Sequence, residues 1–168
     1  MNDGLIDAFR HNAWATRELL SVCLRLTETQ LHATAPGTYG SVIATLRHTV
    51  ASEAGYYARL AGEEPGWDRR AEAPASVDEL ARRIEDLAAR WERFLARPFD
   101  AERTFLIEWH DGRDRDVPAG VVLAQALHHG NEHRAHICTV LSSIGVTPPD
   151  LGLWDYAEAT NRARPRQM

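Results

Sequence analysis

Apolar residues recur every three or four positions along most of the chain, with polar residues between them, and this periodicity predicts helices. The first helix is predicted over residues 5–26, with Asp3 available as its N-terminal cap. Ser41 is suited to cap a second helix that runs to residue 60, because its hydroxyl can accept a hydrogen bond from a backbone N–H of the first turn. Gly62 follows and stops that helix.

A third helix is predicted over residues 76–97. Ser76 is followed three residues later by Glu79, the spacing of a capping box, and a proline at position 98 ends the pattern. The preceding residues 62–75 are rich in glycine, proline and charge, so we expect a surface loop there that contains one aromatic residue, Trp67.

Residues 103–117 have a different pattern, which predicts a β-hairpin. Residues 104–109 are rich in side chains that favour strands. Asp111 and Gly112 form the dipeptide typical of a tight hairpin turn, and residues 113–117 can return as the partner strand. We therefore expect a short hairpin inserted between two helices.

The last part of the chain predicts one long helix and one short one. Pro118 is suited to the first helical position, because its fixed φ angle matches a helix and its missing N–H costs nothing there. This helix is expected over residues 118–144, ended by Gly145, and a short fifth helix over residues 153–163. Together the elements predict an all-α fold, a four-helix bundle with a hairpin insertion and a C-terminal helix, formed by residues 1–168 as one domain.

The composition fits one soluble domain and excludes several classes of protein. Of 168 residues, 44% are hydrophobic, which is enough for a core that needs no metal, so any metal is expected to serve function. The formal net charge is −5 without blocks of like charge, a balance that argues against nucleic acid as a partner. No stretch approaches the roughly 20 apolar residues that span a bilayer, and the first residues lack a signal-peptide pattern. We expect a cytoplasmic protein with no membrane partner.

The two cysteines, Cys23 and Cys138, are far apart and do not have the spacing of a zinc motif. We expect both to be small buried apolar side chains in a reducing compartment.

The most informative chemistry in the chain is the pair His129 and His133. Positions i and i+4 of a helix differ by only about 40° around its axis, so both imidazoles can meet one divalent ion. Imidazole is the commonest metal ligand among side chains, and the best candidate for a third ligand is His48. Its face of the second predicted helix carries small residues, including Ser52 and Gly55, which leave room for an ion.

These residues and their surroundings resemble the DinB/YfiT-like superfamily of metal-binding four-helix proteins. The resemblance rests on Thr45-Leu46-Arg47-His48 and on His129-x-x-x-His133-Arg134, and it extends from an opening helix at residues 9–20 to residues 148–157. It implies that His48, His129 and His133 are the three metal ligands, and it suggests a homodimer. The family often has glutamine where this chain has His136.

Two neighbours of the ligands, His136 and Arg134, are the candidates for a catalytic role. His136 lies on the same helical face, where it can be a fourth ligand or can face water or substrate. We favour the second, because ligands at 129, 133 and 136 span about 10 Å along a helix, too far for one ion. Arg134 can pair with a buried Glu53 or bind a substrate carboxylate, and the sequence leaves both open. His128 points about 100° away from His129, so we expect no ligand role for it.

Three nitrogen ligands with an open fourth position are typical of catalytic zinc sites, and nickel also suits imidazole. The resemblance implies a metal-dependent enzyme, with a thiol-dependent S-transferase as the first hypothesis. In that hypothesis the metal holds a low-molecular-weight thiol and the site accepts a small-molecule electrophile. All 19 basic residues are arginine, which indicates a GC-rich genome and favours mycothiol as the thiol. The alternatives are a metal-dependent hydrolase using activated water and a non-catalytic metal-binding stress-response protein.

Overall fold

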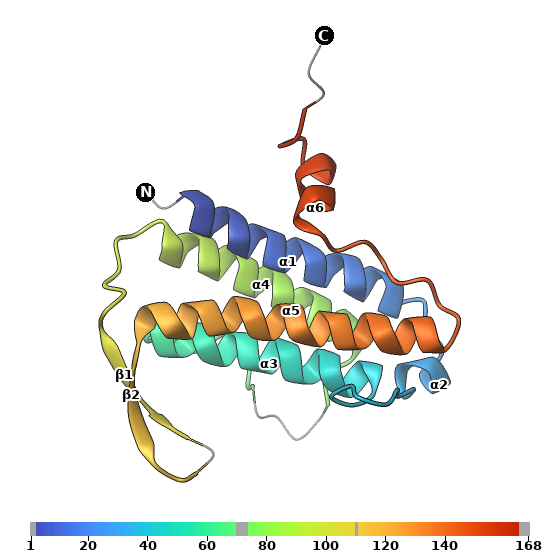
Figure 1. Ribbon diagram of the computed structural model, residues 1–168, viewed down its shortest axis with the longest axis horizontal. Helices are drawn as coiled ribbons and strands as arrows, with labels where there is room; N and C mark the ends of the chain where they lie inside the picture. Colours follow the sequence, from blue (N-terminus) through green and yellow to red (C-terminus); the bar gives the residue numbers. More distant parts are fainter. Residues whose placement is uncertain (1–2, 70–73, 110, 165–168) are drawn as a thin grey trace.

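Four long helices lie side by side and enclose the core in the computed structural model, which describes residues 3–69, 74–109 and 111–164 (Figure 1). Helix α1 packs on α4 and α5, and α3 packs on the same two helices from the other side. The four-helix bundle predicted from the sequence is confirmed. The four helices are α1 (Asp3–Cys23), α3 (Val42–Ala61), α4 (Val77–Leu95) and α5 (Ala119–Ser143).

The core is apolar and continuous between the four helices. Among its fully buried side chains are Leu19 of α1, Leu46 of α3, Leu87 and Trp91 of α4, and Ile137 of α5. Burial of each such side chain contributes about 1.5–3 kcal/mol to folding, so the bundle has a source of stability that does not depend on a metal.

The predicted caps of α3 and α4 are present. The Ser41 hydroxyl accepts a hydrogen bond from the backbone N–H of Ala44 at 3.3 Å, and Ser76 accepts one from Glu79 at 3.2 Å. Gly62 ends α3 in the left-handed conformation, with φ of 75°, which glycine adopts without steric cost. Helix α4 ends at residue 95, two residues before the predicted end.

The start of the chain differs from the prediction in two respects. Helix α1 covers residues 3–23, not 5–26, so Asp3 belongs to the helix and does not precede it. A short helix, α2 (Glu28–Leu31), was not predicted. Thr27 and Gln30 cap it reciprocally: the Thr27 hydroxyl accepts from the Gln30 N–H at 3.3 Å, and the Gln30 side chain accepts from the Thr27 N–H at 2.9 Å.

The predicted hairpin is present and extends past one end of the bundle (Figure 1). It consists of β1 (Thr104–Glu108) and β2 (Asp114–Pro118), which pair antiparallel with Phe105 opposite Val117. Its turn is longer than the dipeptide predicted, because β1 ends at Glu108 and β2 begins at Asp114. Within the turn, the Trp109 N–H donates to the Arg113 carbonyl at 3.0 Å. Gly112 supplies the positive φ that the turn requires, and residue 110 lies outside the described residues.

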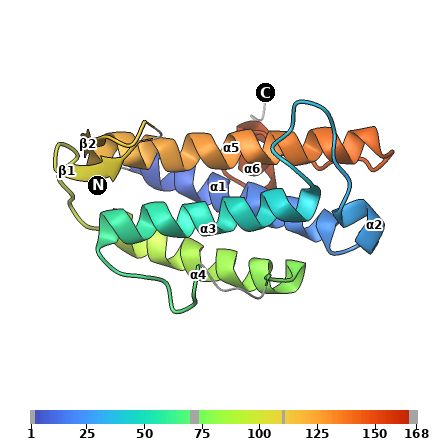
Figure 2. The same ribbon diagram turned by 90° about the horizontal axis from the view of Figure 1, so that it is seen from below.

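The boundaries of the last two helices also need correction. Pro118 is the N-cap of α5 and the last residue of β2, not the first helical residue; its ψ of 145° is extended. Helix α6 (Leu153–Ala159) is shorter than predicted, because Asn161 turns the chain with φ of 56°. Figure 2 shows α6 on the far side of the bundle from α3, where Tyr156 packs against Trp14 of α1.

The described part of the predicted loop after α3 contains neither helix nor strand, and residues 70–73 of this loop lie outside the described residues. Trp67 is half-buried there beneath the guanidinium of Arg83, which lies 4.3 Å from the ring centroid. Among the described residues, no helix is both long enough and apolar enough to cross a membrane.

Candidate metal centre

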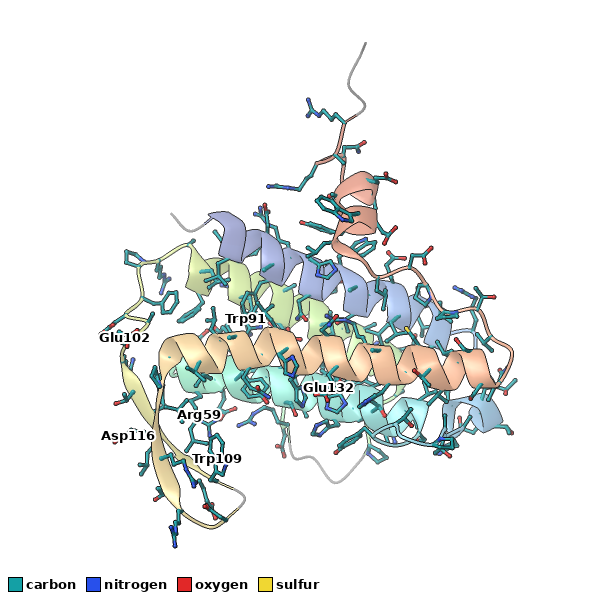
Figure 3. All side chains as sticks on the ribbon, in the orientation of Figure 1. Arg59, Trp91, Glu102, Trp109, Asp116 and Glu132 are labelled. Carbon is teal, nitrogen blue, oxygen red and sulfur yellow. The ribbon has the colours of Figure 1, made fainter. Side chains whose placement is uncertain are left out.

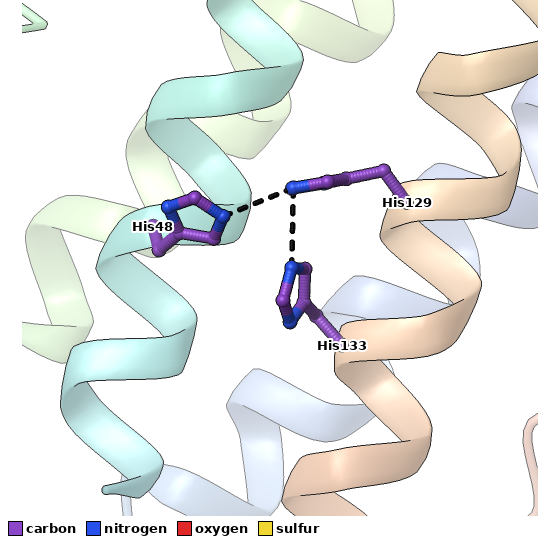
Figure 4. Close-up of side chains that lie close together, drawn as sticks. All are labelled: His48, His129 and His133. Atoms are coloured by element: carbon purple, nitrogen blue, oxygen red, sulfur yellow. Dashed lines mark hydrogen bonds between the residues drawn. The ribbon is translucent and has the colours of Figure 1, made fainter. Parts of the chain in front are cut away.

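Three histidines from two helices meet between α3 and α5 (Figure 4). Nε2 of His129 lies 3.0 Å from Nε2 of His48 and 3.1 Å from Nε2 of His133. The potential ligand atoms of the three rings all lie within 4.8 Å of one another, and the group could hold a metal ion. The sequence therefore predicted which histidines come together, although 81 positions separate His48 from His129.

Helix geometry accounts for this convergence. His129 and His133 are one turn apart on α5, and α3 packs against that face of α5 with His48 toward it. Two nitrogens bound to one tetrahedral zinc at 2.0–2.1 Å are about 3.3 Å apart, so the observed spacings fit an ion after a small outward shift. One ring nitrogen carries either a proton or a lone pair, so Nε2 of His129 cannot make linear hydrogen bonds to both neighbours. A shared cation satisfies all three nitrogens at once.

The electrostatic environment keeps these rings in the form that binds metals. The pKa of His129 is lowered to about 4, chiefly by burial and then by the nearby His133 and His48. Burial also lowers the pKa of His48 and of His133. The three imidazoles are therefore neutral near pH 7, each with a lone pair available to a cation. Nε2 of His133 faces His129, so it is the nitrogen of that ring placed for coordination, whereas Nδ1 is buried without a hydrogen-bond partner in the described part of the chain.

Two tyrosines that the sequence analysis did not single out lie against the histidines. The Tyr39 ring stacks on His48, with centroids 4.3 Å apart and an interplanar angle of 20°, and its edge meets His133 at 4.8 Å. Tyr56, two turns after His48 on α3, meets His129 at 5.6 Å. Tyr39 belongs to the connection between α2 and α3, so its position depends on a loop whose course no helical periodicity predicts.

His136 lies beside the three-histidine group and is not part of it. Its ring centroid is 5.6 Å from that of His133, and its Nδ1 is buried without a hydrogen-bond partner among the described residues.

His128 is exposed and lies 4.0 Å from the Glu132 carboxylate, away from the group, as expected. His11 and His32 bind elsewhere, to the carbonyl of Leu151 and to the carboxylate of residue 28. Residue 110, also a histidine, lies outside the described residues.

Arg134 is placed inside the bundle, where it joins a buried polar network. Its Nη1 donates to Oδ1 of Asn12 at 2.7 Å and to the Thr16 hydroxyl at 3.1 Å. Asn12 in turn donates to Oε2 of Glu53 at 3.0 Å, so the amide of Asn12 connects the arginine to the carboxylate. Only 3% of Arg134 is exposed, and burial lowers its pKa to about 10. The structure thus gives Arg134 an internal role beside Glu53, one of the two alternatives left open by the sequence.

Gly130 makes this network possible. A Cβ at that position would lie 2.7 Å from Oδ1 of Asn12 and 3.0 Å from Nη1 of Arg134, closer than real side chains come. Gly130 stands between the ligands His129 and His133 on α5. The missing side chain therefore lets α1 and α5 approach at the level of the three histidines.

The cysteines take no part in the group. Cys23 is buried, and burial raises the pKa of its thiol to about 12. Cys138 is only half-buried, so the prediction of a buried side chain is wrong for this residue.

Comparison with known proteins settles the family. The sequence matches the model of the DinB family over residues 1–167. The chain belongs to the DinB family. A solved DinB-like protein from Bacillus cereus has the same fold, with a TM-score of 0.66 and 19% sequence identity over 89% of this chain and 96% of that one. No curated protein matches the sequence. DinB proteins are in general metal-binding, which agrees with the three histidines.

Proposed function

We propose that this DinB protein is a metal-dependent S-transferase, in which His48, His129 and His133 hold a zinc or nickel ion that binds a low-molecular-weight thiol. The observation that carries the proposal is the convergence of three neutral imidazole nitrogens with spacings of 3.0 and 3.1 Å. Three protein ligands leave a fourth position for a ligand from solution, as in catalytic zinc sites. A closed site would need a fourth side chain within reach, and the group of candidate ligands in the described residues stops at three.

The donor set fits such an ion. Imidazole suits zinc, copper, iron and nickel, so the metal bound in the cell depends on supply as well as on affinity. When bound, the ion would supply the positive charge that favours a thiolate over a thiol, or hydroxide over water, near neutral pH.

Two aromatic residues border the position next to the ion. The Tyr39 ring covers one face of His48 and fixes the plane of that imidazole. The Tyr56 ring stands nearly perpendicular to that of His129, with centroids 5.6 Å apart. Tyr39 is itself 53% exposed, so the group lies near the surface, where a ligand from solution can reach it. All basic residues of the chain are arginine, which indicates a GC-rich genome, and we therefore propose mycothiol as the thiol.

One observation favours a second candidate, a metal-dependent hydrolase. His136 places a ring 5.6 Å from that of His133, and a neutral imidazole can accept a proton from water as a general base. A thiol transferase needs no such base at the metal, because a coordinated thiol already loses its proton.

Calorimetry with metal-loaded and metal-stripped protein tests the proposal. Mycothiol or mercaptoethanol is titrated into each form, and an alkylating electrophile and an ester are then offered as substrates. Heat that requires the metal, followed by thiol conjugation, supports the transferase. Ester turnover without thiol binding would replace it with the hydrolase, and metal binding without either activity would leave a metal-binding protein. His128→Ala, which changes an exposed histidine outside the group, is the matched control.

A further inference from the structure

The outer face of α3 continues from His48 as a hollow of about 320 Å³. Its lining comprises the side chains or backbone of Ala51, Ser52, Gly55, Tyr56, Arg59 and Arg69. Tyr56 belongs both to this lining and to the surroundings of the histidines, since its ring meets that of His129 at 5.6 Å. The hollow therefore begins where the candidate metal centre ends.

The spacing on α3 explains the direction of the hollow. At 100° per residue, Ser52, Gly55 and Arg59 lie within about 40° of His48 around the helix axis. They form one stripe that leaves His48 and reaches Arg59 after about 16 Å of helix. The middle of the stripe consists of two small residues, Ser52 and Gly55, and its far end carries a cation.

The two arginines at that end differ in their partners. Arg69 binds the Glu64 carboxylate with two hydrogen bonds of 2.9 Å, so most of its charge is balanced. Its Nη1 lies over Gly55, where a Cβ would stand only 2.9 Å away. The guanidinium of Arg59 is exposed, and within the described part of the chain it has neither an ion pair nor a hydrogen-bond partner. Figure 3 shows the Arg59 side chain extending from α3 away from the other helices.

We infer that this hollow, defined by the six residues above, binds the anionic end of an elongated substrate whose reacting end lies at the three histidines. The inference rests on the proposed function, because it takes the metal-bound thiol as the other end of the same site. Arg59 supplies an uncompensated guanidinium whose planar fork matches a carboxylate. Ala51, Gly55 and Tyr56 supply apolar surface for the connecting part of the substrate. The anion is therefore expected between Gly55 and Arg59, about 10 to 16 Å of helix from His48.

The anion can be carried by the thiol or by its electrophilic acceptor. In either case a carboxylate lies at Arg59. If the thiol carries it, the sulfur and the carboxylate belong to one molecule; if the acceptor carries it, they belong to two. The experiment below separates them.

The affinities of mercapto acids of different length for the zinc-loaded protein test the distance between the two ends of the site. Mercaptooctanoic acid and its amide differ only in charge and are long enough to reach from the histidines to the arginines, whereas mercaptopropionic acid and its amide are too short. We expect the long acid to bind about three- to tenfold more tightly than the long amide, between the effects of an exposed ion pair and of a charge-assisted hydrogen bond. The short pair should show no such preference.

The preference should disappear in Arg59→Gln and persist in Arg93→Gln, which removes an exposed arginine from the last turn of α4. Thermal melts should be unchanged in both variants. For the source of the anion, octanoic acid is titrated into protein saturated with mercaptoethanol. Binding that depends on Arg59 assigns the anion to the acceptor; absence of such binding, with the mercaptooctanoic acid preference intact, assigns it to the thiol.

The inference would be overturned if the long acid and amide bound with equal affinity, or if the preference survived Arg59→Gln. Metal-dependent thiol binding in the same experiment would still support the proposed function. Failure of every thiol to bind the zinc form would overturn both together.

Discussion

Arg134 donates from Nη1 to Oδ1 of Asn12 at 2.7 Å, and this contact fills the space that a side chain at Gly130 would occupy. The contact ties α5 to α1 one residue away from the candidate ligands His129 and His133. The side-chain amide of Asn12 also donates a hydrogen bond to Glu53 of α3, the helix that carries His48. The buried network therefore fixes the two ligand-bearing helices relative to each other.

Gly130→Ala should disturb this arrangement. The added Cβ would lie 2.7 Å from Oδ1 of Asn12, so α5 must shift or the hydrogen bond to Arg134 must break. We expect a net loss of about 1–3 kcal/mol in the free energy of unfolding, despite the higher helix propensity of alanine, together with weaker metal binding. Urea unfolding and metal titration measure the two effects.

Gly120→Ala is the matched control on the same helix. A Cβ there would lie 3.5 Å from the nearest atom, an ordinary contact. This variant should be as stable as the parent or slightly more stable. If both variants behave alike, the close approach at Gly130 does not constrain the site.

His129→Ala and His133→Ala should each abolish stoichiometric metal binding while leaving the helical fold intact, because the apolar core does not involve these rings. Loss of one of three ligands should weaken affinity by more than about 100-fold, the upper range for removing an outer partner of a ligand. Metal analysis after gel filtration and circular-dichroism melts check the two halves of this prediction. His128→Ala should keep its metal, and retention of stoichiometric metal in both ligand variants would refute the assignment.

Tyr39→Ala should speed the loss of metal to a chelator, because the ring that covers His48 is removed. Tyr39→Phe keeps the stacked ring and should release metal at the parent rate. Stopped-flow measurements with a coloured chelator compare the three proteins. Equal rates for the alanine variant and the parent would show that the stack does not protect the site.

Cys23 should resist alkylation in the folded protein up to mildly alkaline pH. Its pKa is raised to about 12 from an ordinary value of 9.0, so a higher pH is needed to form the reactive thiolate. Mass spectrometry after iodoacetamide treatment should find Cys138 modified slowly and Cys23 unmodified until denaturant is added. Rapid modification of Cys23 in native protein would contradict its burial.

The sequence predicted α3, α4 and the spacing of the ligands on α5 because their signals are local. Ser41, Ser76 and Gly62 act on adjacent backbone groups, and the i, i+4 spacing of His129 and His133 is a property of one helix. His48 was proposed as their partner from the small residues on its helical face and from the family resemblance, since a contact across 81 positions has no local signal.

Other features depend on how separate elements pack, and the sequence did not show them. Tyr39 reaches the site from a loop, and Asn12 joins the network only because α1 crosses α5 beside Gly130. Pro118 illustrates a local signal with two outcomes, because proline suits the end of a strand as well as the first turn of a helix. The helix α2 did have a signal, the capping pair Thr27 and Gln30, within a segment too short for a periodic pattern.

The absorption spectrum of the cobalt-substituted protein tests the central claim most directly. Cobalt replaces zinc at a site of three nitrogens, and its visible bands report the coordination number, while a thiolate ligand adds an intense charge-transfer band in the near ultraviolet. We expect one cobalt per chain, a charge-transfer band that appears on addition of thiol, and loss of both in His129→Ala. Cobalt that binds equally well to His129→Ala, or that shows no thiolate band at saturating thiol, would contradict the account.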